Sequence, residues 1–257
     1  AAINVLARRA GARVVVTDVG VAADFDPALP IHHRKIAKGT DNLARGSAMS
    51  RDQAIRSLET GIEVFEEEFA AQPFRIAATG DMGIGNTTAS AAMAAVFTGR
   101  GVPELVGRGT GVDDAGLARK VAVIEAALAL RKPEASDPVG VLAAVGGYEI
   151  GALAGVVLAA AARRIPVLID GYISGAAALL AAALCPLSKE YMLGTHVSGD
   201  AGHAIMLEFL GLKPLLRLGM RLGEGTGAAL AMPLCAAACA VLNEMATFES
   251  AGVSGKL

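Results

Sequence analysis

The stretch RRIPVLIDGYISGAAALLAAALC, Arg163–Cys185, contains a short apolar run, a glycine turn and an alanine-rich segment, in that order. The run Val167–Ile169 is followed directly by Asp170, a pattern typical of a parallel strand that is buried on both faces. The residues after Gly171 are mostly Ala and Leu, which favour a helix. A strand, a tight turn and a helix in succession form the repeating unit of a parallel α/β sheet.

The same order of elements recurs elsewhere in the chain. FRIAATGDMGIGNTTASAAMAAVF (74–97) and KEYMLGTHVSGDAGHAIMLEFLG (189–211) each predict a strand, a loop and a helix, and ARVVVTDVGV (12–21) predicts a buried strand ending at Asp18. Further helices are expected at 50–71, where Ser50 is a capping residue, and at 115–130. Residues 24–46 lack periodicity and predict a long loop.

These patterns predict an α/β fold with a doubly wound, Rossmann-like parallel sheet flanked by helices and a small helical lobe. We expect residues 1–224 to form a large α/β nucleotide-binding domain and residues 225–257, which show no strand pattern, to contribute to the lobe. In such sheets ligands bind at the carboxyl ends of the strands, where the glycine-rich loops gather.

Composition limits the possible partners. The 257 residues carry a net charge of −2 without basic runs, which argues against a nucleic-acid partner. The apolar segments 139–162, 171–187 and 225–242 are rich in Ala and Gly, and each is short or interrupted by Glu149 or Pro233, so we expect no membrane span.

The chain opens without Met, so we expect a fragment or a processed chain. It also opens without a signal-peptide pattern, so we expect a cytoplasmic protein. Three cysteines without a CxxC pair are expected to be buried, reduced side chains.

Two glycine-rich loops have the composition of phosphate-binding loops. In TGDMGIGNTTAS (79–90), Gly83 and Gly85 allow close approach to the backbone, Asn86 or Thr87 can cap the next helix, and the free N–H groups of its first turn attract an anion. The loop lacks the Lys of a Walker motif, and Thr88 breaks a GxGxxG pattern. In GRGTGVDDAGLARK (107–120), the paired acids favour a helix start, and Lys120 is either an ordinary surface lysine or a phosphate ligand.

Two further strand-end loops are less specific. Ser198 and Asp200 in HVSGDAGH (196–203) can be caps, phosphate ligands or a nucleophile with its partner, but the surrounding sequence is not a GxSxG elbow. The four histidines lack metal-ligand spacing and are expected to be structural, so no metal site is predicted.

Glu224 stands between glycines in LGMRLGEGTGAALAMP (218–233). The residue types alone leave two interpretations equally open. The carboxylate either stabilises the N-terminus of the following helix or acts on a ligand, by taking a proton or by stabilising positive charge at a sugar carbon.

Six long motifs, in the order of the family, closely resemble nicotinate-nucleotide–dimethylbenzimidazole phosphoribosyltransferases: GDMGIGNTT, VGRGTGVDDAGLARK, AAVGGYEIGALAG, IDGYISGAAALLA, HVSGDAGH and LRLGMRLGEGTGAALAMP. The resemblance runs from AAINVLAR at the start to EMATFESAGV near the end. It implies transfer of phosphoribose from nicotinate mononucleotide to 5,6-dimethylbenzimidazole without a metal or cofactor, by an enzyme that works as a homodimer.

The resemblance also implies site residues. Glu224 would be the general base, and Leu222 and Gly223 would line the pocket for the benzimidazole. Asp170 would lie near the ribose. The other residues expected to bind the mononucleotide are Asp81, Gly83, Gly85, Asn86, Thr87, Gly109, Thr110, Lys120, Gly171, Ser198 and Gly199.

The chain departs from the family in two ways. Asp81 stands where the family usually has Glu, which shortens the acid by one methylene, and a family segment that precedes AAINVLAR and contacts the benzimidazole is not in this sequence. The second departure leaves open a nucleotide-binding protein without turnover. A dinucleotide-dependent oxidoreductase fits less well, because the GxGxxG pattern is imperfect and no ribose-binding acid follows at the usual distance.

Overall fold

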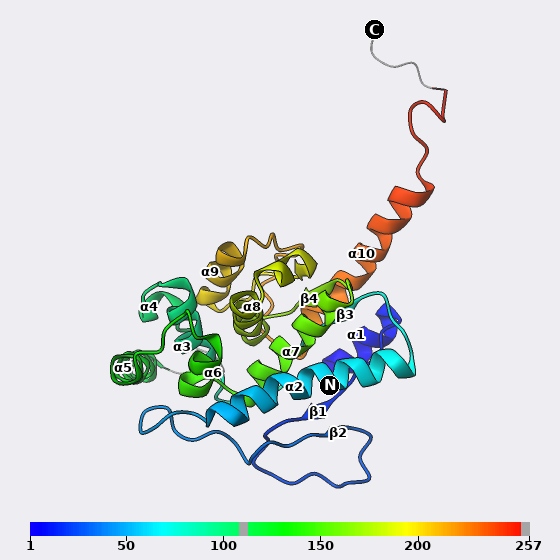
Figure 1. Cartoon of the computed structure of the whole chain (residues 1–257). Coiled ribbons are helices and arrows are strands. Elements are labelled where there is room, and N and C mark those ends of the chain that lie inside the picture. The colour runs from blue at the N-terminus through cyan, green and yellow to red at the C-terminus, as the bar shows by residue number, and fades with distance from the viewer. Residues whose placement is uncertain (108–112, 253–257) are drawn as a thin grey trace.

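The computed structural model describes residues 1–107 and 113–252 and shows an α/β fold with parallel strands, as predicted (Figure 1). Most of the described chain is helical, and the strands are short. In chain order the elements are α1 Ala2–Ala10, β1 Thr17–Asp18, β2 His32–His33, α2 Arg51–Ala71, β3 Ala77–Ala78, α3 Thr87–Thr98, α4 Val102–Leu105, α5 Asp114–Arg131, α6 Pro138–Val145, α7 Tyr148–Ala162, β4 Val167–Ile169, α8 Tyr172–Leu184, the 3-10 helix η1 Pro186–Tyr191, β5 Met192–Gly194, α9 Ala201–Leu210 and α10 Thr226–Glu244.

The central sheet is parallel and has the order β3-β4-β5. Ala77 pairs with Val167, and Val167 pairs with Met192, so the three predicted strand-turn-helix units lie side by side. The loops that follow these strands therefore meet at one edge of the sheet, as expected for a ligand site in an α/β fold.

Helices cover both faces of β4, which explains its uninterrupted apolar run. Val167 and Ile169 belong to the main core with α3, α7 and α8, whereas Leu168 points to the opposite face and packs against Ala228 and Ala231 of α10. Alternating side chains of a strand face opposite ways. A strand buried on both faces must therefore be apolar at every position.

The strand predicted at 12–21 differs from the expectation. Among the described residues, β1 pairs with β2, from the predicted long loop, in a separate two-stranded parallel sheet. Val14, Val15 and Val16 are 40%, 43% and 51% exposed, so they lie outside the core. The prediction of a buried strand here was wrong because an apolar β-branched run indicates a strand but does not indicate what covers it.

The helix predictions agree with the structure. Ser50 caps α2, accepting a hydrogen bond from the Gln53 N–H, and Asp113 caps α5, accepting from the Gly116 N–H. Glycines allow α2 and α7 to pack closely: a Cβ added at Gly61 would collide with the Ala152 carbonyl, and one at Gly155 with the Leu58 carbonyl. The Ala- and Gly-rich composition thus reflects tight contact between helices.

The predicted C-terminal helical segment is a single helix, α10. It begins on the sheet beside α1 and then extends away from the body of the fold (Figure 1). Among the described residues, it is also the helix long and apolar enough to cross a membrane, although it contains Pro233 and 28% of its apolar window is buried.

The prediction of buried cysteines was wrong. Cys185 and Cys239 are exposed and Cys235 is half-buried, because α8 ends before Cys185 and the second half of α10 is uncovered.

Candidate functional site

The β3–α3 loop is organised by Asp81. Its Oδ2 accepts hydrogen bonds from the Gly83 N–H at 3.0 Å and from the Asn86 Nδ2 at 2.9 Å. Burial raises the pKa of Asp81, and these two donors oppose the rise. Asn86 occupies the N-cap position of α3, but its side chain makes no capping bond within the described structure. The first turn of α3 therefore presents backbone N–H groups that its capping side chain does not use, at the expected place for an anion.

Lys120 of α5 supplies a positive charge at the same helix end. Its Nζ donates to the Thr87 Oγ1 at 2.6 Å and to the Gly107 carbonyl at 3.4 Å. Burial lowers the pKa of Lys120, and the nearby Asp200 carboxylate opposes that shift. Thr87 and Lys120, both expected to bind the mononucleotide, are therefore in contact, whereas the predicted ligands Gly109 and Thr110 lie outside the described residues.

Glu224 lies on a turn of unusual backbone conformation. Gly223, Glu224 and Gly225 have φ angles of +77°, +61° and +83°, in the left-handed region that only glycine adopts readily. For a glutamate this conformation costs about 1–2 kcal/mol. The Glu224 N–H donates to the Asp81 carbonyl at 3.0 Å, which joins this turn to the β3–α3 loop.

The Glu224 carboxylate is incompletely paired. Its Oε2 is buried and has no hydrogen-bond partner among the described residues. A buried carboxylate oxygen without a donor costs free energy that a structural role does not recover. A strained backbone and an unpaired acid at one residue together favour the interpretation of Glu224 as a residue that acts on a ligand.

Asp170, at the end of β4 as predicted, lies beneath this turn. Its Oδ2 accepts from the Gly225 N–H at 2.9 Å, and its Oδ1 accepts from the N–H groups of Gly227 at 2.8 Å and Ala228 at 3.2 Å. Asp170 is 1% exposed. These contacts favour a positioning role over the expected ribose contact: Asp170 caps α10 and holds the turn that carries Glu224.

The neighbouring histidines, His196 and His203, make hydrogen bonds within the fold. His196 is buried with its Nδ1 3.0 Å from the Thr195 Oγ1 and 4.0 Å from the Asp170 Oδ1. Burial and His196 lower the pKa of His203 to about 3, so its neutral Nδ1 accepts from the Ser198 N–H. The Ser198 hydroxyl instead accepts from the Asp200 N–H at 3.3 Å. This arrangement does not form a Ser-His-Asp triad.

The remaining predicted residues border this region in different ways. Gly171 is buried at the start of α8 beside His196, and Gly199 donates its N–H to the Met220 carbonyl. The Leu222 side chain is 57% exposed. In the β3–α3 loop, Met82 is 75% exposed and Ile84 is 89% exposed. Exposed apolar side chains on both loops suit a flat aromatic ligand.

Sequence reasoning missed Glu149. It lies in the first turn of α7 and is half-buried. Burial raises its pKa to about 7, the Asp81 charge adds to the rise, and the Asn86 amide partly opposes it. The signal that could have found it was present, since Glu149 is an acid in an otherwise apolar segment and lies two residues after Gly147.

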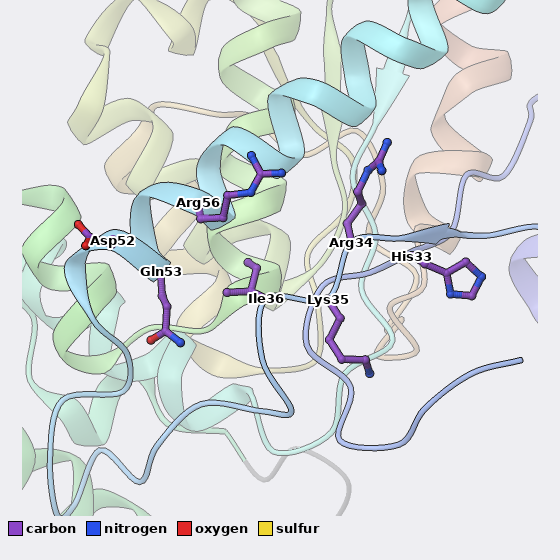
Figure 2. A pocket seen from close by; sticks show the side chains of 7 residues that line it. All are labelled: His33, Arg34, Lys35, Ile36, Asp52, Gln53 and Arg56. Atoms are coloured by element: carbon purple, nitrogen blue, oxygen red, sulfur yellow. The ribbon is translucent and has the colours of Figure 1, made fainter. Parts of the chain in front are cut away.

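A cavity of about 520 Å³ elsewhere is lined by His33, Arg34, Lys35, Ile36, Asp52, Gln53 and Arg56 (Figure 2). Its cations are neutralised, because Arg34 pairs with Glu67, Lys35 with Asp18 and Arg56 with Glu63. None of the predicted site residues lines it, so the cavity is distinct from the candidate site. Within the described residues, no group of three or more His, Cys, Asp or Glu side chains is placed to hold a metal ion.

An uncapped helix start beside a half-buried lysine, at the carboxyl ends of parallel strands, is an arrangement of an α/β protein that suits a phosphorylated ligand. The family model described as Phosphoribosyltransferase matches residues 1–253. The chain belongs to this phosphoribosyltransferase family and is an enzyme of that class.

Similar sequences and solved structures belong to the same family as the chain. The chain is 59% identical over 254 residues to nicotinate-nucleotide–dimethylbenzimidazole phosphoribosyltransferase of Desulforudis audaxviator, covering 99% of this chain and 72% of the relative. It is 58% identical over 256 residues to the protein of that name from Chloroflexus aggregans, and the match covers 100% of this chain and 72% of that protein. The crystal structure of CobT from Thermus thermophilus matches with a TM-score of 0.94 and 45% identity, covering 100% of this chain and 76% of that one. These relatives are thus longer than the sequence described here.

Proposed function

We propose that this enzyme transfers the 5-phosphoribosyl group of nicotinate mononucleotide to 5,6-dimethylbenzimidazole, giving α-ribazole 5′-phosphate and nicotinate. The names of its relatives support these substrates. The observation that carries the role of Glu224 is its buried, unpaired Oε2 on a strained turn beside the β3–α3 loop.

The charge distribution of the site suits the donor. Lys120 contacts Thr87 at the start of α3, and Asp81, in the loop before that helix, accepts the Glu224 N–H at its carbonyl. Nicotinate mononucleotide has an anionic phosphate at one end and a cationic pyridinium nitrogen bonded to the ribose. We place its phosphate near Lys120 and Thr87, with Gly83, Gly85 and Asn86 along the ribose phosphate, and its ring toward the carboxylates.

In the proposed reaction, one imidazole nitrogen of the benzimidazole attacks the anomeric carbon of the ribose. The bond from that carbon to the pyridinium nitrogen breaks, its electron pair stays on nicotinate, and the configuration inverts. The Glu224 carboxylate takes the proton from the other imidazole nitrogen, so the product is neutral at its new ring. Gly223 and Leu222 would border the ring, where the absence of a side chain at Gly223 permits close approach.

Three further expectations remain proposals. We propose that the enzyme acts in the cytoplasm and as a homodimer. The predicted division into residues 1–224 and 225–257 is supported by the way α10 leaves the body of the fold, although α1 packs against its first turns.

The test is a chromatographic assay of the purified chain with both substrates, following release of nicotinate and formation of α-ribazole 5′-phosphate. We expect product from the wild type and a loss of about 10²–10⁴-fold in kcat for Glu224→Gln, the usual contribution of a general base. Glu125→Gln, at an exposed position of α5, is the matched control. Mononucleotide binding without product from the wild type would favour the alternative of a binding protein without turnover. Full activity of Glu224→Gln would exclude Glu224 as the base.

A further inference from the structure

The Asp200 carboxylate lies against Gly107, just after α4. A Cβ on Gly107 would collide with the Asp200 Oδ1 and would lie 3.1 Å from its carboxyl carbon. The start of α9 packs closely on the same segment, because a Cβ on Gly202 would lie 2.5 Å from the Leu105 carbonyl oxygen. Two glycines therefore allow α9 to bring the Asp200 side chain up to the Gly107 backbone.

Lys120 contacts the same glycine through its carbonyl group. The Lys120 Nζ donates to the Gly107 carbonyl at 3.4 Å and to the Thr87 Oγ1 at 2.6 Å. The ammonium group and the Asp200 carboxylate thus meet at one residue, without a direct ion pair between them in the described structure. Burial lowers the pKa of Lys120, and the Asp200 charge opposes this shift, as expected of a nearby counter-ion.

The Asp200 side chain leaves a favourable position unused. Asp200 is the N-cap residue of α9, and its φ of −78° and ψ of 121° are those of a capping residue, yet its side chain makes no capping hydrogen bond. Asp113 and Asp137 stand at the same position of α5 and α6, and both make this bond. The difference requires an interaction that draws the Asp200 carboxylate toward Gly107.

The described neighbours of Asp200 leave Lys120 as the source of that interaction. Burial and then the Asp200 charge raise the pKa of Tyr172, but the Tyr172 hydroxyl donates to the Leu105 carbonyl at 2.6 Å. The Asp200 N–H donates to the Ser198 Oγ, which holds the backbone and not the carboxylate. Attraction to the Lys120 ammonium therefore explains why the side chain lies at Gly107 and not on the helix start.

A phosphate beside Lys120 changes this balance. It brings more negative charge than a carboxylate and repels an acid that lies on the neighbouring glycine. The capping position of α9 remains within reach of the same side chain, because an N-cap Asp accepts from N–H groups two or three residues further along. The carboxylate can therefore leave Gly107 and still find a donor.

We propose that Asp200 is a displaceable counter-ion, which balances the Lys120 charge in the free enzyme and turns to cap α9 when the phosphate of the mononucleotide binds. By competing with the phosphate, Asp200 lowers the affinity for every phosphorylated ligand of the site, the product included, and so favours product release. This inference rests on the proposed function, because it requires the phosphate to bind beside Lys120.

The experiment measures the Kd of ribose 5-phosphate and of nicotinate mononucleotide by isothermal titration calorimetry for the wild type and Asp200→Asn. Asn caps a helix as well as Asp does but carries no charge. The variant should bind both ligands about two- to fivefold more tightly, the range of a partly exposed charge interaction. Inhibition by α-ribazole 5′-phosphate should strengthen by the same factor. Glu125→Gln, which removes an exposed acid of α5, should bind as the wild type does.

Salt dependence separates a charge effect from a structural one. The ratio of the two Kd values should approach one between about 0.01 M and about 1 M salt, because the Debye length falls from about 30 Å to about 3 Å. Asp200→Ala removes both the charge and the cap, so it should gain less affinity than Asp200→Asn.

Gly107→Ala moves the carboxylate without removing its charge, because the added Cβ takes its place. It should tighten phosphate binding in the wild type and add nothing in the Asp200→Asn background. If Asp200→Asn does not fold, Asp200→Ser, which also provides a cap, replaces it in the titrations.

The outcomes distinguish this inference from the proposed function. Equal or weaker phosphate binding by folded Asp200→Asn overturns the counter-ion, and so does a gain that salt does not diminish. If the wild type still forms product in either case, the transferase reaction stands without the inference. If the folded wild type binds neither ligand and forms no product, the proposed function fails, and the inference fails with it.

Discussion

Replacing Glu224 by glycine should make the protein more stable and remove its activity. The φ angle of +61° at Glu224 lies between the positive φ angles of Gly223 and Gly225. A third glycine would adopt this conformation without strain. The same change removes the carboxylate whose buried Oε2 has no partner among the described residues. Stability and activity are therefore expected to change in opposite directions at this position.

The size of the gain follows from three contributions. Relief of the left-handed backbone contributes about 1–2 kcal/mol, and the greater freedom of glycine in the unfolded chain costs about 0.4–1 kcal/mol. Loss of the unpaired buried oxygen contributes up to about 1–3 kcal/mol more. The net gain of about 1 kcal/mol or more corresponds to a rise in Tm of about 2–4 °C for a chain of this size.

The assay compares Tm by calorimetry and kcat by chromatography for Glu224→Gly, Glu224→Gln and Glu224→Ala. All three should lose about 10²–10⁴-fold in kcat, a barrier increase of about 3–5 kcal/mol. Only the glycine variant relieves the backbone, so its Tm should exceed that of the alanine variant. A glycine variant no more stable than the alanine variant would refute the argument from strain. A glycine variant with wild-type kcat would refute the assignment of the base.

Two other substitutions probe the same site. A Cβ at Gly80 would lie 2.6 Å from the Gly225 backbone nitrogen and 2.8 Å from the Glu224 carbonyl carbon, so Gly80→Ala should lower the free energy of unfolding by about 1–3 kcal/mol and reduce kcat by displacing the Glu224 turn. A Cβ at Gly46 would meet no described atom within 4 Å beyond its chain neighbours, so Gly46→Ala should leave both quantities unchanged. Equal effects of Gly80→Ala and Gly46→Ala in denaturant unfolding and turnover assays would contradict the close packing at Gly80. Lys120→Met should weaken binding of nicotinate mononucleotide and of ribose 5-phosphate by about tenfold or more each, since hydrogen bonds to charged groups contribute about 1.5–3 kcal/mol. Calorimetry that shows a loss for the mononucleotide alone would place Lys120 away from the phosphate.

Local sequence was sufficient for the strand-turn-helix units and for several caps. The apolar run before Asp170 and the Ala-rich segment after it formed β4 and α8 as predicted, and Ser50 and Asp113 cap the helices that they precede. These features depend on backbone propensity and on hydrogen bonds between near neighbours, which a sequence shows directly. The β-branched run 12–21 failed as a prediction because burial depends on segments distant in the chain.

The candidate site was predicted in part. Lys120 and Thr87, two residues expected at the site, are in contact, but the hydrogen bonds of Asp170 go to Gly225, Gly227 and Ala228, and Glu149 was not predicted at all. Each missed relation joins residues more than 50 positions apart. Sequence spacing carries no information about such contacts.

The sequence by itself determined which chemical groups are available: the glycine loops, a lysine in α5, and acids at positions 81, 149, 170 and 224, together with the family to which they belong. Only the tertiary structure decided how these acids divide their roles. Asp170 accepts hydrogen bonds from three backbone N–H groups, Asp81 accepts from the Asn86 amide and the Gly83 N–H, burial raises the pKa of Glu149 to about 7, and Glu224 is left with an oxygen that has no partner among the described residues. The physical reason is that the charge state and reactivity of a carboxylate depend on its burial and on the donors around it, and the packing of distant segments sets both.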